Sequence, residues 1–126
     1  MLDKVDNMFT EQTIQAVWEK AIVVDGYNAS TIRKDSCGAW IIRTDYGNTN
    51  SIYGWEIDHI YPVEKGGDDN IENLRALQWE NNRSKGDDYP FYSASVQAED
   101  SANVHIDRQF SINQAIQDRI REIYGI

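Results

Sequence analysis

Apolar positions near the N-terminus recur at the spacing of a helix. They fall every three or four residues, at Ile14, Val17, Trp18 and Ala21. This spacing places them on one face of an α-helix, so we predict a helix over about residues 9–24. Thr10 can serve as its N-cap, and we expect Gly26 to stop it.

A second stripe with the same spacing lies near the C-terminus. Its members are Ile112, Ala115, Ile116, Ile120 and Ile123. It predicts a helix over about residues 111–124, with Ser111 and Gln114 forming a capping box at its start. Gly125 follows its end. We expect both terminal helices to pack on the rest of one domain.

The middle of the chain predicts a strand, a turn, a strand and a helix in that order. Residues 53–61 are rich in aromatic and β-branched side chains and predict a strand that Pro62 ends. After a glycine-rich turn, residues 74–78 return as a second strand. Residues 79–85 predict a helix that ends at Gly86.

The pattern is weaker on either side of this unit. Residues 40–42 predict a further strand, and residues 92–98 alternate between apolar and polar side chains, which favours a short strand. Residues 25–35 and 99–104 are polar and predict loops. With 126 residues, the chain fits one α+β domain spanning residues 1–126.

The polar residues with the most specific spacing lie in the central unit. Asp58 and His59 are adjacent on its first strand, and Asn82 lies on its helix. Carboxylate and amide oxygens, as in Asp58 and Asn82, are ligands that a hard cation such as Mg²⁺ accepts. His59 is the candidate general base, because an imidazole is largely neutral at pH 7. The set suits hydrolysis of a phosphodiester in a nucleic acid.

The geometry of a strand complicates this interpretation. Adjacent residues of a regular strand point to opposite faces, so Asp58 and His59 share a site only if the strand ends, twists or bulges there. Asn73 lies at the end of the following turn. Its amide can hydrogen-bond to the backbone and hold the loop after His59 in place, which is a positioning role.

Two basic residues on the predicted helix are candidates for contact with substrate. Lys85 lies three residues after Asn82, on the same helix face, where it can reach a phosphate. For Arg83, we give equal weight to contact with substrate and to a position on the solvated helix surface. Asn81 competes with Asn82 as the metal ligand. Neighbours on a helix point about 100° apart, so only one of them can face the ion.

Composition limits the class of protein. The net charge is −9, whereas proteins that bind nucleic acids are usually basic. The charge therefore argues against tight, unassisted binding of DNA. It is compatible with acidic groups that cluster away from a small basic cleft, or with a basic protein partner. Cys37 is the only cysteine, which excludes an internal disulfide and a zinc site built from cysteines. No apolar run is long enough to cross a membrane, and the N-terminus lacks the pattern of a secretion signal, so we expect a cytoplasmic protein.

The same residues resemble a known family. The motifs are Asp58-His59-Ile60-x-Pro62, Gly66-Gly67-x-Asp69, Asn73-Leu74-x-x-Leu77 and Asn82-x-x-Lys85-Gly86. Together they are similar to the HNH endonucleases of bacteria and phages and to the HNH domains of RNA-guided CRISPR effectors. The resemblance is strong over residues 55–88 and weaker from Cys37 to Trp55. It places the motif core at about residues 37–90.

The resemblance implies a small ββα-metal core, here with flanking N- and C-terminal helices, one divalent cation and cleavage of DNA. It implies that His59 is the general base, that Asp58 and Asn82 bind the metal, and that Asn73 braces the loop. Mg²⁺ is the expected ion and Mn²⁺ the alternative. The four-cysteine zinc site of many relatives is absent, so packing must hold this core together.

Three biological settings stay open at this point. As an active enzyme, a monomer with one cutting centre is expected to nick DNA, within a larger nuclease assembly or alone. A toxin nuclease neutralised by an immunity protein would use the same chemistry. A non-catalytic acidic module that keeps the fold and binds a basic protein is the alternative from another class.

Overall fold

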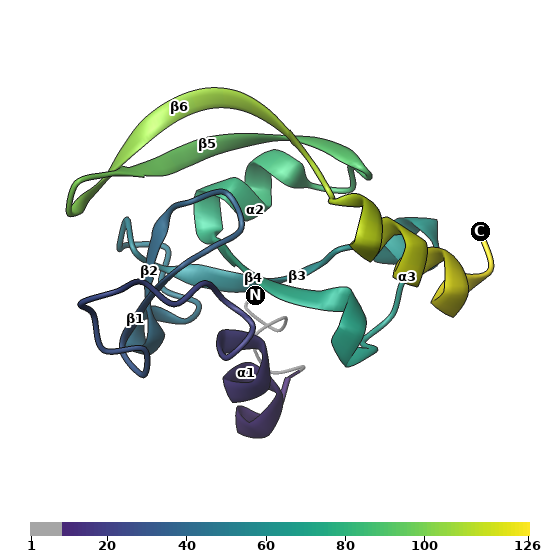
Figure 1. Ribbon diagram of the computed structural model, residues 1–126, viewed down its shortest axis with the longest axis horizontal. Coiled ribbons are helices and arrows are strands. Elements are labelled where there is room, and N and C mark those ends of the chain that lie inside the picture. The colour runs from purple at the N-terminus through teal and green to yellow at the C-terminus, as the bar shows by residue number, and fades with distance from the viewer. Residues whose placement is uncertain (1–8) are drawn as a thin grey trace.

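The computed structural model describes residues 9–126 and shows an α+β protein (Figure 1). Its helices are α1 (Glu11–Trp18), α2 (Trp79–Lys85) and α3 (Gln114–Tyr124). Its strands are β1 (Ile32–Lys34), β2 (Trp40–Ile42), β3 (Trp55–His59), β4 (Leu74–Gln78), β5 (Phe91–Glu99) and β6 (Ala102–Ser111). Consecutive strands pair into three antiparallel, two-stranded sheets. Within residues 9–126, no helix has the length and apolar character needed to span a membrane.

The β3–β4 hairpin and α2 form the centre of the molecule, in the order that the sequence predicts. The strands pair in regular register from Trp55 opposite Gln78 to His59 opposite Leu74. Helix α2 follows β4 directly and ends at Gly86, whose φ of 52° and N–H bond to the Asn82 carbonyl close the last turn. The confirmed unit is strand, turn, strand, helix.

The two faces of the central hairpin pack against different elements. One face carries Trp55, Ile57, Leu74 and Ala76, and it packs against Ile14, Val17 and Trp18 of α1. Leu77 is on the opposite face, in a second cluster with Tyr92 of β5, Ile112 just before α3 and Ile120 within α3. Alternation along each strand produces these two surfaces. The hairpin therefore lies in the interior, between α1 on one side and α2 with β5 on the other (Figure 1).

A buried carboxylate joins the β1–β2 hairpin to the start of α2. Asp35 is fully buried and accepts hydrogen bonds from the backbone N–H groups of Cys37 and Ala39 (both 2.9 Å). Its second oxygen accepts from Gln78 N (2.8 Å) and Asn81 Nδ2 (3.1 Å). Burial raises the pKa of Asp35, and the N–H donors oppose that rise. This network connects segments that are distant in sequence, in a core that has no cysteine zinc site.

The β5–β6 hairpin arches over α2 (Figure 1). Asn81 of α2 attaches to β5, because its Oδ1 accepts from Ser95 N and Val96 N (both 2.8 Å) and its Nδ2 donates to Val96 O (2.9 Å). The alternation over residues 92–98 correctly predicts a strand, although β5 is longer. The loop predicted over 99–104 is wrong from residue 102, where β6 begins.

The terminal helices differ from their predicted bounds. The N-cap at Thr10 is confirmed by its bond from Thr13 N. Helix α1 nevertheless ends at Trp18, well before Gly26, because Ile22 forms a β-bridge with Lys34. Helix α3 is capped by Asn113, whose side chain accepts from Ile116 N, because Ser111 still belongs to β6. Gly125 ends α3 in the left-handed conformation, as predicted.

The polar stretch before the central unit also contains structure that the sequence pattern does not indicate. β1 lies within the predicted loop 25–35 and pairs with β2. None of its three residues is fully buried, so the strand carries no strong hydrophobic signal. The single-domain organisation over residues 1–126 stays a prediction.

Candidate functional site

His59 ends β3 and faces the loop that follows it. Its Nε2 lies 2.7 Å from Oδ1 of Asp69, and its side chain is 24% exposed. The ring of Phe9 is 6.2 Å away, centroid to centroid. The imidazole is thus partly open to solvent and fixed by one carboxylate, which suits a group that must meet a water molecule.

Asn73 binds the loop after His59 from inside. The residue is fully buried. Its Oδ1 accepts from Tyr61 N (2.7 Å), and its Nδ2 donates to Tyr61 O and Asp68 O (both 3.0 Å). The carbonyl of Asn73 also accepts from Ile60 N (2.8 Å). One side chain therefore ties the two ends of segment 61–68 together.

The glycine pair in this loop has a steric reason. Gly66 has a φ of 115°, which side-chain-bearing residues rarely adopt. A Cβ on Gly67 would lie 1.8 Å from the carbonyl oxygen of Tyr61 and 3.0 Å from Asn73 Nδ2. The backbone turns this closely only without side chains, so the glycines and Asn73 act together to shape the loop.

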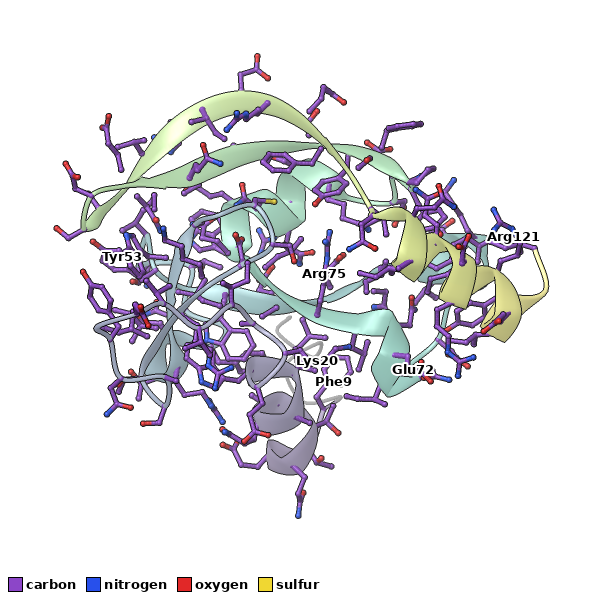
Figure 2. All side chains as sticks on the ribbon, viewed as in Figure 1. Phe9, Lys20, Tyr53, Glu72, Arg75 and Arg121 are labelled. Atoms are coloured by element: carbon purple, nitrogen blue, oxygen red, sulfur yellow. The ribbon has the colours of Figure 1, made fainter. Side chains whose placement is uncertain are left out.

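Asp58 projects from β3 into a buried cluster of charges. It is 4% exposed, and its Oδ2 accepts from Arg75 Nε at 2.9 Å. Its Oδ1 lies 3.3 Å from Lys85 Nζ. Arg75, on the neighbouring position of β4, also lies over the ring of Tyr92 at 5.0 Å. Figure 2 shows Arg75 reaching from β4 toward the β5–β6 side, away from α1.

Lys85 does not lie where the sequence led us to expect it. Its side chain is 0% exposed, so in this structure it does not face a phosphate. Besides Asp58, its Nζ donates to the backbone carbonyl of His59 at 3.2 Å. Burial lowers the pKa of Lys85, and the Asp58 carboxylate opposes that change. The helix face was predicted correctly, but that face packs onto β3.

Asn82 and Arg83 contact the same carboxylate on β3. Asn82 Nδ2 donates to Oε1 of Glu56 (2.9 Å), and Arg83 Nη2 donates to Oε2 (2.8 Å). Asn82 makes this contact through Nδ2, so its amide oxygen takes no part in it. The amide oxygen is the atom that would bind a cation. The side chain of Arg83 is 60% exposed. Asn81 points elsewhere and is fully used in the bonds to Asp35 and β5, which removes it as a competitor.

The structure brings the candidate residues together as two groups. β3 runs regularly through His59 without a bulge, so Asp58 and His59 leave the strand on opposite faces. Asp58 joins Lys85 on the α2 side, whereas His59 joins Asp69 at the loop. The groups meet at the end of β3, where Lys85 contacts both the Asp58 carboxylate and the His59 carbonyl.

The donor set on the α2 side fits a hard cation in chemistry. Glu56 and Asp58 lie two residues apart on one face of β3, and α2 presents Asn82 to that face. These are oxygen donors of the kind Mg²⁺ binds. Both oxygens of Asp58 are already paired with cationic groups, so an ion would have to replace Lys85 at Oδ1. Over residues 9–126, no cluster of three or more His, Cys, Asp or Glu side chains could hold a metal by itself.

Sequence reasoning missed Arg75 and Glu56. Arg75 is a charged residue within a strand whose five residues are all buried, and it lies opposite Asp58 in the pairing register. The long loop over residues 60–73 does not fix that register from the sequence. Glu56 lies two residues before Asp58 on β3 and shares its face by strand alternation. Asp69 belongs to the motif Gly66-Gly67-x-Asp69, but its pairing with His59 depends on the shape of the loop.

Comparison with known proteins finds a family match in the central part of the chain. Residues 37–88 match the family model described as HNH endonuclease. No curated protein and no solved structure matches the chain. The matched segment runs from Cys37 to Asp88 and contains β2, the β3–β4 hairpin and α2. The family match therefore confirms the resemblance found in the motifs.

Proposed function

We propose that this protein is a divalent-metal-dependent endonuclease that hydrolyses phosphodiester bonds in DNA. The observation that supports the proposal most is the β3–β4–α2 unit, which lies inside the segment that matches HNH endonucleases. This unit presents a partly exposed histidine at the end of its first strand. The loop after that histidine is tied internally by Asn73.

His59 acts as the general base in this proposal. Its imidazole accepts a proton from a water molecule, and the water oxygen forms a bond to phosphorus. The bond between phosphorus and the departing sugar oxygen breaks, and that oxygen takes a proton from solvent. Asn73 does not transfer protons. It keeps the loop beside His59 in one shape, so that the base and its water meet in a fixed geometry.

Asp58 and Asn82 would hold the cation, with Mg²⁺ as the expected ion and Mn²⁺ as the alternative. When bound, such an ion neutralises charge on the phosphate and on the departing oxygen. Glu56 is a further oxygen donor on the same face. Arg75 and Lys85 both form ion pairs with Asp58.

The basic residues take different parts in this proposal. Arg83 is the candidate for contact with a DNA phosphate, because its side chain is 60% exposed. Lys85 supports Asp58 and the end of β3 from the interior. With one cutting centre, a single chain nicks one strand, and a double-strand break needs two chains or two events.

A plasmid assay tests the proposal. Supercoiled plasmid is incubated with the protein and Mg²⁺ or Mn²⁺, then with EDTA, and nicked circles are quantified on a gel. We expect nicking that EDTA abolishes and that His59→Ala reduces by about 10²- to 10⁴-fold, the usual contribution of a general base. His105→Ala is the matched control, because this second histidine is 72% exposed and contacts Glu80 on the surface.

Two outcomes would contradict the proposal. Nicking that survives both EDTA and His59→Ala would come from a contaminant. A folded protein that fails to nick with any divalent ion would favour the second candidate function, a non-catalytic acidic module that binds a basic protein. The net charge of −9 favours that candidate. So does the pairing of exposed arginines with acidic side chains, as in Arg119 with Glu72 and Arg121 with Asp118.

A further inference from the structure

We infer that Asp69 is a positioning residue that fixes His59 with its hydrogen on Nε2, so that Nδ1 is the atom that takes the proton from water. We also infer that helix α3 holds Asp69 in place. Both inferences rest on the proposed function, and they assign a task in it to Asp69 and α3, for which the sequence predicted no role in the site.

The first step follows from the contact between His59 and Asp69. The two atoms, Nε2 and Oδ1, are 2.7 Å apart, which is the distance of a strong hydrogen bond. The side chain of Asp69 is 58% exposed, and a solvent-exposed carboxylate is ionised at neutral pH. An ionised carboxylate can only accept hydrogen bonds. The hydrogen must therefore be on Nε2.

The second step concerns the other ring nitrogen. A neutral imidazole carries one hydrogen and one lone pair, so a hydrogen on Nε2 leaves the lone pair on Nδ1. That nitrogen accepts the proton from water as the oxygen attacks phosphorus and the sugar oxygen departs. Asp69 then faces an imidazolium ion, which a carboxylate stabilises. Without Asp69, the ring would be free to turn or to exchange its hydrogen between nitrogens.

The third step is the attachment of the Asp69 loop to α3. Tyr124, at the end of α3, donates its hydroxyl hydrogen to Asp68 Oδ1 (2.5 Å) and accepts from Asp68 N (3.2 Å). Arg119 forms a two-pronged contact with Glu72, at 2.6 and 2.8 Å. Asn73 binds the Asp68 carbonyl from the inner side. Contacts on both sides of Asp69 thus restrict the backbone that carries it.

The position of α3 makes this attachment informative. Residues 114–124 lie outside the segment that matches HNH endonucleases. Helix α3 lies beside the loop that joins β3 to β4 (Figure 1), and Figure 2 shows Glu72 below the helix. A segment beyond the family core therefore supports the group that orients the base.

An NMR experiment tests the pairing without DNA or metal. The chain has two histidines, so His105→Ala leaves His59 as the only imidazole and assigns its signals. At a pH of about 8, where an ordinary imidazole is neutral, we expect a one-bond ¹H–¹⁵N correlation at Nε2 and a non-protonated Nδ1. Adding Asp69→Ala should abolish this correlation, because the N–H then exchanges rapidly with water.

Glu64→Ala is the matched control for Asp69→Ala. Glu64 is exposed and lies in the same loop, so its removal deletes an equal charge near the site. It should leave the Nε2 correlation intact. A hydrogen found on Nδ1, or an Nε2 correlation that persists in Asp69→Ala, would overturn the inference.

Kinetics provide the second measurement. We expect Asp69→Ala to lower kcat for plasmid nicking by about 10- to 100-fold, the usual effect of losing the partner of a functional histidine, while KM stays near the wild-type value. Glu64→Ala should change neither. Tyr124→Phe should lower kcat by a smaller factor. Its control is Tyr89→Phe, because both rings pack against Tyr61 but only the Tyr124 hydroxyl binds Asp68.

The two measurements separate this inference from the proposed function. If the wild-type protein does not nick DNA but shows the Nε2 correlation, the proposed function fails and the pairing stands. If the wild-type protein nicks and Asp69→Ala nicks equally fast, Asp69 has no positioning role and the proposed function stands.

Discussion

At the scale of residues, the unusual feature is a buried cluster with one negative and two positive groups. Asp58 contacts both Arg75 and Lys85, and all three side chains are at least nine-tenths buried. Removing one partner from a buried ion pair costs more than the pair contributes, because a charge is left without compensation. The effect of a substitution here therefore depends on which sign remains.

This cluster predicts a large loss of stability for one substitution and a small change for another. Asp58→Asn leaves two buried cations and should lower the free energy of unfolding by about 3–5 kcal/mol. Lys85→Met leaves a balanced pair and should change it by about 1 kcal/mol or less. Urea denaturation followed by tryptophan fluorescence measures both. Equal stability of Asp58→Asn and the wild-type protein would contradict the account.

A variant that combines Asp58→Asn with Lys85→Met helps to test whether Asp58 is a metal ligand. A loss of nicking in Asp58→Asn alone could reflect unfolding. Asp58→Asn with Lys85→Met leaves one buried cation, Arg75, instead of two, and should recover part of the lost stability. If this variant is folded but does not nick, while Lys85→Met does, the carboxylate itself is required.

The sequence indicates the identity of the site residues better than their orientation. Motif spacing selects His59, Asn73 and Asn82 as candidates, and the structure places Asn82 where it faces β3. Spacing could not show that Lys85 is buried, because a lysine on the face of a helix is equally compatible with solvent. The partner of His59 depends on the turn at Gly66 and Gly67, whose geometry is a property of the folded loop.

At the scale of elements, prediction succeeded where glycines bound a segment, as Gly66 and Gly67 do before β4 and Gly86 does after α2. The strand at 74–78 and the helix at 79–85 were predicted at the bounds that the structure shows. β6 was missed because most of its residues are exposed or partly exposed, so it carries no hydrophobic pattern. It forms through backbone pairing with β5, which composition does not indicate.

The connection through Asp35 predicts a large effect of a small change. Asp35→Asn replaces one of the two acceptor oxygens with an NH₂ group, so a buried N–H loses its partner. This should lower the free energy of unfolding by about 1–3 kcal/mol. Chemical denaturation measures it against Asp25→Asn, an exposed control whose effect should stay within about 0.5 kcal/mol. Equal effects of the two substitutions would show that Asp35 does not join these segments.

At the scale of the whole molecule, acidic groups outnumber basic ones by 21 to 12. Several arginines are also committed to ion pairs, including Arg43 with Glu11 and Arg119 with Glu72. Binding of DNA through phosphate contacts depends on cations that can release counterions. We therefore expect weak binding that relies on few contacts, or on a partner protein that supplies positive charge.

Salt dependence can measure the part that Arg83 plays. If Arg83 contacts one phosphate, Arg83→Ala should reduce the steepness of log K against log salt concentration by about 0.9. Arg121→Ala, which removes an exposed arginine from α3, should leave the slope unchanged. Fluorescence anisotropy with a labelled duplex provides the data. An unchanged slope in Arg83→Ala would make Arg83 an ordinary solvated side chain.

The cover on both faces of the β3–β4 hairpin limits how this protein can be taken apart. Helix α1 shields one face, and β5 with α3 shields the other, yet all three lie outside residues 37–88. A fusion that grafts only those residues onto another scaffold would carry the candidate site residues. It would also expose to water the apolar residues of the hairpin that α1, β5 and α3 cover. A transferable unit made from this chain therefore has to include α1, β5 and α3.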